Sequence, residues 1–174
     1  MTGANTGLGL EAAKHLVDLG AEKVVLGVRN VAAGKAAVAE IETSTGKSNI
    51  AEVWELDLSS YASVKAFAKK AIAELDRIDA LIENAGVALA QRVLAEGHIV
   101  PLTVNVYSTF LLGVMLIPKM SEGAKKFGIL PHLVIVTSRA SFDFKEDWDK
   151  IKDDPLKKMD AEDMVPLKTY AANA

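Results

Sequence analysis

Cysteine is absent from the 174 residues of this sequence, and histidine occurs only three times. The absence of cysteine excludes disulfide bonds and thiolate metal sites. The three histidines are scattered along the chain and lack carboxylates at helical pairing distance, so we expect no metal centre. A chain without disulfides fits the cytosol, and we expect a cytoplasmic protein.

A strong charge of either sign is also missing. The sequence has 20 Lys and Arg residues against 23 Asp and Glu residues, which gives a formal net charge of −3. No basic stripe is present that would attract nucleic acid or an anionic membrane surface. We therefore expect neither of these as a partner.

Long hydrophobic runs are missing as well. The longest apolar stretch, Phe110–Pro118, is too short to span a bilayer, and it lies far from the N-terminus. It therefore predicts neither a membrane span nor a signal peptide. Because half of the residues are hydrophobic and no linker or repeat divides the chain, we expect residues 1–174 to form one domain.

What the sequence does contain is a glycine-rich segment, Thr2–Gly9 (TGANTGLG), that leads into an amphipathic helical pattern. The first turn of a helix has unpaired N–H groups and a partial positive charge, so it attracts anions. We expect Gly3 to open a tight turn, Gly7 to leave room for a pyrophosphate, and Gly9 to let the helix pack closely on a strand. A glycine-rich turn without a ligand has the same appearance. The candidate phosphate-binding residues are Gly3, Asn5, Thr6, Gly7, Leu8 and Gly9.

Short apolar runs alternate with helical patterns along the rest of the chain, which indicates a doubly wound parallel α/β sheet of the Rossmann type. Near-continuous apolar runs predict strands that are buried on both faces, at Lys23–Val28, Ala51–Leu56, Ile78–Ile82 and Leu133–Thr137. Helices are predicted at Val31–Thr43, at Ser60–Leu75 and at about Glu96–Met120, with Pro101 near the start of the last. The first helix has its apolar stripe at Leu8, Ala12, Leu16 and Leu19, followed by Gly20 as a C-terminal cap.

Four further motifs follow the glycine loop in order: Asp57-Leu58, Asn84-Ala85-Gly86, Val104-Asn105-Val106, and the segment VTSRAS at 136–141. Together with the TGxxxGxG pattern, they resemble the short-chain dehydrogenase/reductase family over nearly the whole chain. From the residues alone, Asp57 could accept a hydrogen bond from an adenine amino group or cap the next helix. The Asn84-Ala85-Gly86 turn could border a cofactor ribose or be a plain turn.

The resemblance implies an oxidoreductase that transfers a hydride between a nicotinamide and a carbonyl or alcohol. It implies Tyr170 as the acid/base, Ser138 as the residue that holds the substrate oxygen, and Asn105 as the residue that holds a water of a proton relay. After the second predicted strand, where NAD-preferring sites have an acidic residue, this sequence has Arg29. A guanidinium suits the 2′-phosphate of NADP, so we expect NADP(H) rather than NAD as the cofactor, although a solvated surface arginine is the alternative.

The sequence departs from the family pattern at its ends. The family has a lysine four residues after the tyrosine, but here Ala174 occupies that position. The family's first strand precedes the TG loop, and further strands follow the tyrosine. We therefore expect a Rossmann-type sheet that lacks the usual first and C-terminal strands, as in a fragment or truncated gene model of a longer reductase or in a degenerate relative. Such a monomer would have to close the gap in its sheet or recruit a strand.

The segment Phe142–Met164 lengthens the distance between Ser138 and Tyr170 and is dense in charges of both signs. We expect an exposed, partly helical excursion that could border a substrate pocket, and its length resembles retinol-dehydrogenase-like and fungal-type members. The expected substrate is a small apolar molecule. The long helix suits either a homodimer interface or core packing. Because the lysine is missing, a non-redox cofactor-binding scaffold, lyase, isomerase or cyclase is the alternative to a reductase.

Overall fold

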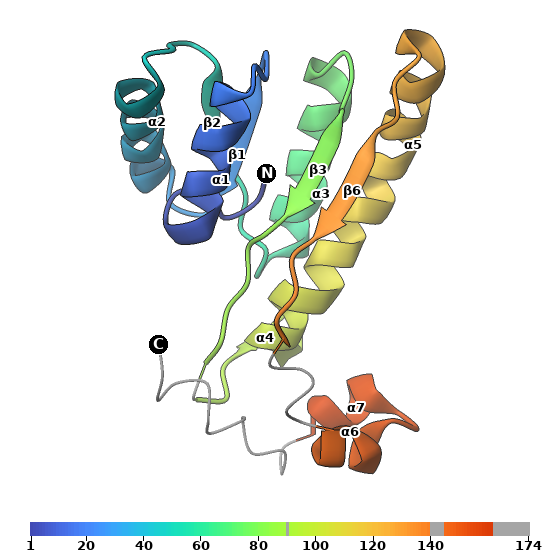
Figure 1. The fold of residues 1–174 in the computed structure, drawn as a ribbon. Helices are drawn as coiled ribbons and strands as arrows, with labels where there is room; N and C mark the ends of the chain where they lie inside the picture. The colour runs from blue at the N-terminus through green and yellow to red at the C-terminus, as the bar shows by residue number, and fades with distance from the viewer. Residues whose placement is uncertain (90, 140–144, 162–174) are drawn as a thin grey trace.

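The structure is a computed structural model that describes residues 1–89, 91–139 and 145–161 (Figure 1). Its main helices are α1 (Gly7–Asp18), α2 (Val31–Thr45), α3 (Tyr61–Glu74) and α5 (Thr109–Phe127). A short helix α4 (Val100–Leu102) and a π-helix η1 (Thr103–Ser108) lead directly into α5, and the short helices α6 (Lys145–Ile151) and α7 (Pro155–Met159) follow the last strand. The strands are β1 (Val24–Val28), β2 (Ala51–Glu55), β3 (Ala80–Glu83), β4 (Leu94–Ala95), β5 (His98–Ile99) and β6 (His132–Ile135).

Within the described residues, the strands pair two by two. β1 pairs with β2 in parallel, from Val24 opposite Ala51 to Val28 opposite Glu55. β3 pairs with β6 in parallel, from Ala80 opposite His132 to Glu83 opposite Ile135. β4 and β5 form a small antiparallel hairpin. The expected strands are therefore present, each one residue shorter than the sequence pattern predicts, and β3 and β6 are displaced by one or two residues.

Met1 and Thr2 lie between the two parallel pairs. Thr2 forms an isolated parallel bridge with Gly27 of β1, and the amide of Gly27 donates to the carbonyl of Met1 at 2.9 Å. On the other side, the Thr2 amide donates to the carbonyl of Ile82 in β3 at 2.9 Å. Two residues thus join β1 and β3 at their carboxyl ends, where the expected gap in the sheet lies.

Helices cover both faces, as expected for a doubly wound sheet (Figure 1). On one face, α1 and α2 pack on β1 around a cluster that includes Leu10, Val17, Leu26 and Ile41. On the other face, α3 and α5 pack around a second cluster with its own large side chains, among them Trp54, Phe67, Leu112, Leu116 and Met120.

Several expectations about which side chains are buried are wrong. In α1, the buried stripe consists of Leu10, Ala13 and Val17, whereas Leu8 and Leu19 are 83% and 85% exposed. The stripe is displaced because Gly9 packs against the preceding loop and turns Leu8 outward. Leu133 and Val134 of β6, and Val136 directly after it, are exposed rather than buried on both faces.

The helix expected at about Glu96–Met120 begins later and ends later. Glu96 and Gly97 both have positive φ angles, of 54° and 85°, and form the turn of the β4–β5 hairpin. The continuous helical segment Val100–Phe127 contains Pro101 in its first turn and ends at Gly128 in the left-handed conformation. By length and composition this segment could cross a membrane, although about half of its most apolar window is buried inside the protein.

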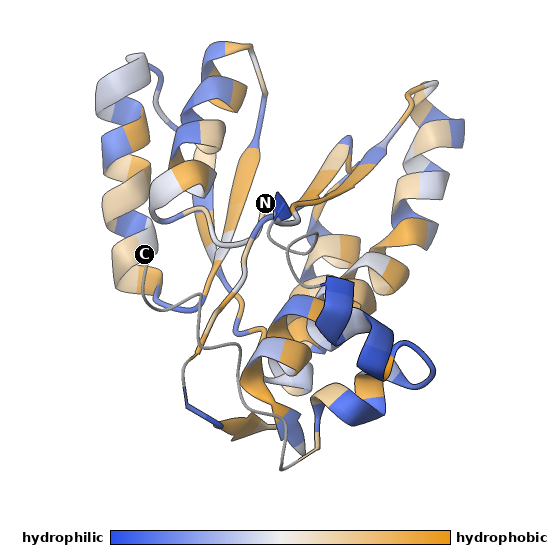
Figure 2. Ribbon diagram, turned by 60° about the horizontal axis from the view of Figure 1, so that its bottom comes forward, coloured by the Kyte–Doolittle hydropathy of each residue, from blue (hydrophilic) through white to orange (hydrophobic). Residues whose placement is uncertain are grey.

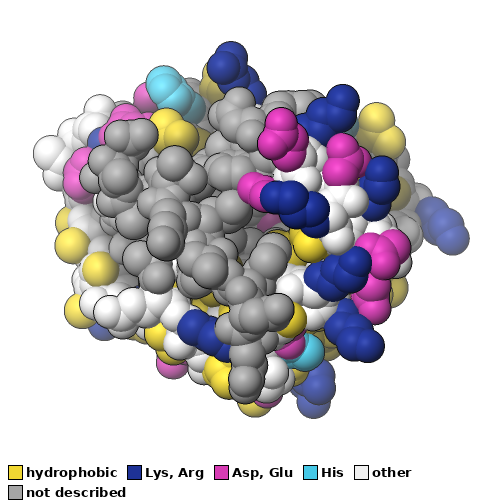
Figure 3. All heavy atoms as spheres, turned by 90° about the horizontal axis from the view of Figure 1, so that it is seen from below, with side chains coloured by type: hydrophobic (Ala, Val, Ile, Leu, Met, Phe, Trp, Pro, Cys, Tyr) yellow, Lys and Arg dark blue, Asp and Glu magenta, His cyan; other side chains and the backbone are white. Residues whose placement is uncertain are grey.

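The segment of residues 145–161 is an exposed, mostly hydrophilic excursion, as expected (Figure 2). Acidic and basic side chains lie next to each other on its surface (Figure 3). They form ion pairs of 2.6–2.9 Å that stay within the segment, Lys150–Asp147, Lys152–Asp149 and Lys158–Asp153. Exposed pairs of this kind contribute little to stability.

Candidate functional site

The glycine loop is held against β3 by unusually close contacts. Gly3 has φ +64°, and a Cβ at this residue would lie 2.8 Å from the Cα of Ala85. A Cβ on Gly9 would lie 2.5 Å from the carbonyl oxygen of Gly3 and 2.6 Å from the Nδ2 of Asn84. Gly3 thus permits both the turn and the contact with Ala85. Gly9 permits contact of the helix with the loop and with Asn84, rather than with a strand as we expected.

Thr2 and Asn84 fasten this contact with hydrogen bonds. The Thr2 hydroxyl accepts from the backbone amides of Asn84 and Ala85, both at 3.0 Å. The side-chain amide of Asn84 donates to the carbonyls of Thr2 and Gly3, both at 3.2 Å. The Asn84-Ala85-Gly86 segment therefore has a definite structural role, which is to hold the glycine loop against the end of β3.

The first turn of α1 is open to an anion. The N-cap residue Thr6 makes no side-chain capping bond, and the first turn carries no acidic residue. Gly7 has φ +57°, and no atom lies within 4 Å of the position that its Cβ would take. Unpaired N–H groups beside an open glycine suit a pyrophosphate. Of the predicted loop residues, Thr6, Gly7 and Leu8 are exposed at this turn, and Asn5 is partly buried.

Arg29 and Asp57 lie at neighbouring strand ends. Arg29 follows the last residue of β1, and the bond from the Leu56 amide to the Val28 carbonyl (2.9 Å) brings the end of β2 beside it. The Arg29 side chain is exposed and, among the described residues, makes no hydrogen bond or ion pair. The Asp57 Oδ1 accepts from the amide and hydroxyl of Ser59, at 2.9 and 2.6 Å.

The alternative in which Asp57 caps the next helix is wrong, because Ser60 caps α3 by accepting from the Ser63 amide. Asp57 instead closes the turn before that helix. Leu58, which follows it, is buried in the core. Of this pair, only the polar residue is available to a ligand.

Asn105 lies in the π-helix η1, an irregularity that is frequent at functional sites. Its side-chain Oδ1 accepts from the Val87 amide at 2.8 Å, and its Nδ2 donates to the Val87 carbonyl at 2.9 Å. A Cβ on Gly86 would lie 3.5 Å from the same Oδ1. Asn105 therefore clamps the chain directly after the Asn84-Ala85-Gly86 turn.

Ser138 is exposed three residues beyond the end of β6. The Val136 amide donates to the Glu83 carbonyl at 2.9 Å, so the chain leading to Ser138 runs beside the end of β3. The structure thus brings Asn84, Asn105 and Ser138 to the carboxyl edge of the β3–β6 pair, where doubly wound folds bind ligands. Tyr170 and Ala174 lie outside the described residues.

These features, in this order along one sheet edge, agree with a known family. A family model described as short chain dehydrogenase matches residues 1–147. The chain belongs to this family. A short chain dehydrogenase/reductase of Cryptosporiopsis sp. is 45% identical over 139 residues, which cover 79% of this chain and 43% of that protein. A short-chain dehydrogenase of Penicillium roqueforti is 39% identical over 138 residues, covering 79% of this chain and 36% of that protein.

Solved structures of short-chain dehydrogenases have the same fold. One from Sphingobium yanoikuyae in complex with NADPH superposes with a TM-score of 0.68 at 26% identity, covering 84% of this chain and 55% of that one. The 3-ketoacyl-(acyl-carrier-protein) reductase from Brucella melitensis, complexed with NADH, has a TM-score of 0.65 at 28% identity, covering 80% and 56%. The chain spans less than half the length of the curated relatives it matches.

One buried acid in this short-chain dehydrogenase was not among the expected site residues. Glu83, the last residue of β3, is 2% exposed, and neither carboxylate oxygen has a hydrogen-bond partner among the described residues. Burial raises the pKa of Glu83 from 4.5 to about 8, and the nearby N-terminal ammonium opposes this only in part. At neutral pH the carboxyl group is therefore mainly protonated. An acidic residue directly before Asn84, inside an apolar strand pattern, is the sequence signal for it.

The β4–β5 hairpin carries a second group of residues missed by sequence reasoning. The Glu96 carboxylate accepts from the Tyr61 amide at 2.8 Å, so the hairpin turn contacts the start of α3. Burial and the neighbouring Glu96 carboxylate raise the pKa of the Tyr61 phenol. His98 bonds to Asp160, 62 residues away, with 2.7 Å between Nδ1 and Oδ2. The Glu96-Gly97 pair is a turn signal, but nothing in the sequence links His98 to Asp160.

Proposed function

We propose that this chain carries the cofactor-binding part of an NADP-dependent oxidoreductase that interconverts a carbonyl and an alcohol on a small apolar substrate. The observation that supports it most strongly is the open, uncapped first turn of α1 beside Gly7. Membership of the family and solved relatives that contain NADPH or NADP add support.

The residues present fit such a cofactor along the sheet edge. The N–H groups at the start of α1 would hold the pyrophosphate, and Asp57 would accept from the adenine amino group. Arg29, whose fork of donors is free among the described residues, would bind the 2′-phosphate. Ala85 and Gly86 would border the nicotinamide ribose. The cofactor, when bound, supplies the hydride.

The chain's own residues would supply the proton and the geometry. Asn105 fixes the loop after Gly86 through its two bonds to Val87, so it holds one wall of the reaction site in place. Ser138 would hold the substrate oxygen, and Tyr170 would donate or accept the proton. Lowering the pKa of a tyrosine from about 10 to near 7 takes roughly 4 kcal/mol of preferential stabilisation of the phenolate.

Leu8 offers a direct test of the phosphate site, because it is exposed in the first turn of α1. In the variant Leu8→Glu, a carboxylate next to the pyrophosphate is expected to weaken NADPH binding at least tenfold, as followed by nicotinamide fluorescence. The matched control is Leu19→Glu, at the other end of the same helix and equally exposed. The control is expected to bind like the wild type.

An acidic residue in the first turn favours a helix, so Leu8→Glu is not expected to lower stability. Lost NADPH binding in a protein that still unfolds cooperatively would therefore report on the phosphate site. If the wild type shows no binding at millimolar NADPH, or if both variants bind equally, the proposal is wrong.

Arg29 tests the choice between NADP and NAD. Replacing it by Gln removes one charge-assisted bond to the 2′-phosphate, and each 1.4 kcal/mol corresponds to tenfold in affinity. We expect NADPH to bind about tenfold more weakly and NADH to bind unchanged. The control Lys125→Gln removes an exposed positive charge in the last turn of α5 and should alter neither affinity. If Arg29→Gln weakened the binding of NADPH and of NADH equally, Arg29 would have no role in the choice between the two cofactors.

A second candidate function follows from the residue four positions after Tyr170, which is alanine. Without a lysine cation there, the phenol is not activated in the family's way, and the pocket could instead serve a cofactor-binding scaffold, a lyase, an isomerase or a cyclase. NADPH turnover with a panel of ketones would exclude this alternative. Absence of turnover that Ala174→Lys restores in a C-terminally extended chain would support it.

We also propose a homodimer that pairs the outer faces of α5. Phe110, Val114 and Ile117 recur at helical spacing on this face and are 55%, 64% and 46% exposed. An apolar stripe of this kind suits an interface between identical chains. Sedimentation is expected to show a dimer for the wild type and a monomer for Val114→Lys. A monomeric wild type would refute this arrangement.

A further inference from the structure

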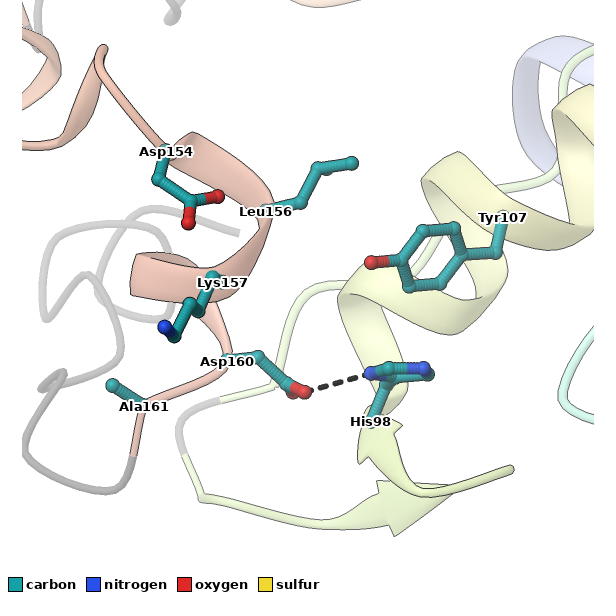
Figure 4. A pocket seen from close by; sticks show the side chains of 7 residues that line it. All are labelled: His98, Tyr107, Asp154, Leu156, Lys157, Asp160 and Ala161. Atoms are coloured by element: carbon teal, nitrogen blue, oxygen red, sulfur yellow. Dashed lines mark hydrogen bonds and ion pairs between the residues drawn. The ribbon is translucent and has the colours of Figure 1, made fainter.

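An open pocket of about 520 Å³ lies away from the glycine loop, between α7 and the π-helix η1. Tyr107 of η1 and Leu156 of α7 point toward each other across it (Figure 4). His98 of β5 and Asp160, just after α7, close one end, and Asp154 and Lys157 lie at the rim (Figure 4). Sites for small molecules commonly have volumes of roughly 300–1,000 Å³, so the size is suitable.

Asp160 holds the α7 wall of the pocket in place. Its Oδ2 bonds to His98 Nδ1 at 2.7 Å and its Oδ1 accepts from the Ile99 amide at 2.8 Å. Its carbonyl accepts from the Arg92 guanidinium at 3.0 Å. The His98 ring in turn lies against the Tyr107 ring, with 4.7 Å between the ring centroids. Asp160 thus holds α7 against the β4–β5 hairpin. His98 of that hairpin in turn contacts Tyr107 on the opposite wall of the pocket.

The pocket is placed to serve the proposed reaction. The wall formed by α7 belongs to the stretch of chain between Ser138 and Tyr170. Figure 1 shows α6 and α7 beyond the carboxyl ends of β3 and β6, and Ser138 follows the carboxyl end of β6 by three residues. Ligands of doubly wound folds bind on that side.

We propose that this pocket is the subsite that receives a ring-sized apolar group of the substrate, an inference that rests on the proposed function. The phenol ring of Tyr107 and the side chain of Leu156 offer apolar surface to such a group. Both Asp160 oxygens are occupied by hydrogen bonds, and the opposite charges of Asp154 and Lys157 balance at the rim. The site therefore suits a neutral ligand rather than an ion.

The test uses 2-acetylnaphthalene as the probe and 2-butanone, which lacks the ring, as its reference. Binding of each ketone to the full chain is followed by calorimetry, with and without NADPH. We expect the naphthyl ketone to bind at least tenfold more tightly than butanone. In Leu156→Trp the indole fills the pocket, so this preference is expected to fall to about one, while NADPH affinity stays unchanged.

Leu130→Trp is the matched control, because Leu130 is 79% exposed in the loop before β6. It should leave the preference intact. A second pair of variants tests the wall: His98→Ala should reduce the preference, whereas His98→Asn, whose amide can still donate to Asp160, should keep most of it. A purely structural histidine would change the unfolding midpoint without changing the ratio of the two ketone affinities.

The outcomes separate the two proposals. If NADPH binds but Leu156→Trp retains the wild-type preference, or the wild type has no preference, the subsite is wrong and the proposed function stands. If the preference depends on Leu156 but NADPH does not bind, the pocket is a ligand site and the cofactor proposal is wrong.

Discussion

The proposed cofactor side of the molecule is joined by close contacts of glycines and by hydrogen bonds from Thr2 and Asn84 to backbone groups, whereas the proposed substrate side is joined mainly by the hydrogen bonds of one residue, Asp160. On the cofactor side, Thr2, Gly3 and Gly9 meet the end of β3 at distances that leave no space for added atoms. On the substrate side, residues 94–108 and 145–161 meet through the bonds of Asp160. The comparison teaches that sterics fix the first region, while the second depends on a few polar contacts that single substitutions can remove.

The largest expected effect concerns a buried carboxyl on the cofactor side, compared with an exposed one. Glu83 has a pKa of about 8 in the folded protein and an ordinary value of 4.5. Between these pH values the folded state retains a proton that the unfolded state has lost. The free energy of unfolding therefore falls as pH rises through this window, by up to about 1.4 kcal/mol per pH unit.

Glu83→Gln removes this titration. The difference in the free energy of unfolding between this variant and the wild type is expected to increase between pH 4.5 and pH 8. It should reach roughly 4 kcal/mol in favour of the variant and then stay constant. The N-terminal amine, whose pKa burial lowers from 8.0 to about 6, titrates with the opposite sign in both proteins, so the difference between them is the quantity to measure. Urea unfolding at several pH values gives it. The control Glu55→Gln, at the exposed end of β2, should show no such growth.

A smaller effect is expected from the glycines. Gly9→Ala forces a Cβ against the Gly3 carbonyl and should lower the free energy of unfolding by about 3 kcal/mol, as overpacking does. In Gly7→Ala the added Cβ lies in open space, and the alanine only has to adopt a positive φ. This variant should therefore lower the free energy of unfolding by about 1 kcal/mol. Urea unfolding of both variants tests the difference. Equal losses would mean that the contact with Asn84 does not fix the loop.

Two asparagines sharpen the comparison further. Asn84→Ala deletes two bonds to the partly buried carbonyls of Thr2 and Gly3 and should cost about 1.5 kcal/mol. Asn105→Ala deletes two bonds to Val87, but water can replace these because Asn105 is exposed, so we expect about 0.5 kcal/mol. Thermal unfolding at constant pH measures both. A larger loss for Asn105 would reverse the ranking of the two regions.

The smallest effect on global stability is expected on the substrate side. Asp160→Ala releases α7 from the hairpin, and trypsin should then cleave the lysine-rich segment 145–161 several-fold faster, with little change in the unfolding midpoint. Asp154→Ala is the control, because Asp154 lines the same pocket but its side chain does not cap α7. Unchanged cleavage in both variants would show that Asp160 does not hold this segment.

Sequence patterns predicted the positions of the helices and strands better than they predicted which side chains of each element are buried. The alternation of apolar runs gave β1, β2, β3 and β6, because strand periodicity is a local property. The buried stripe of α1 differs from the predicted one because Gly9 packs on the glycine loop and on Asn84, and the contact with Asn84 has no local signal in the sequence. β6 was expected to be buried from its composition alone, although the burial of a strand depends on which elements cover the two faces of the sheet.

In the candidate site, too, residues that belong to short motifs were predicted, whereas contacts between distant residues were not. Gly3, Gly7, Asn84, Asn105 and Ser138 were predicted because short motifs carry them, and the structure brings the last three to one sheet edge. The role of Thr2 in holding Asn84 and the pairing of His98 with Asp160 were not predicted. Both depend on contacts between residues more than sixty positions apart, which a single sequence does not encode in any local pattern.

The contact between Glu96 and the Tyr61 amide joins the two regions. Through it, a residue of the substrate-side hairpin satisfies a backbone donor in the first turn of α3, the helix that follows Asp57. A ligand that holds the hairpin in this position therefore also favours the ordered start of α3 and the turn in front of it. If a cofactor binds at Asp57 and a substrate binds beside the hairpin as proposed, coupling through this contact is reciprocal, and each ligand would favour the other by the same free energy.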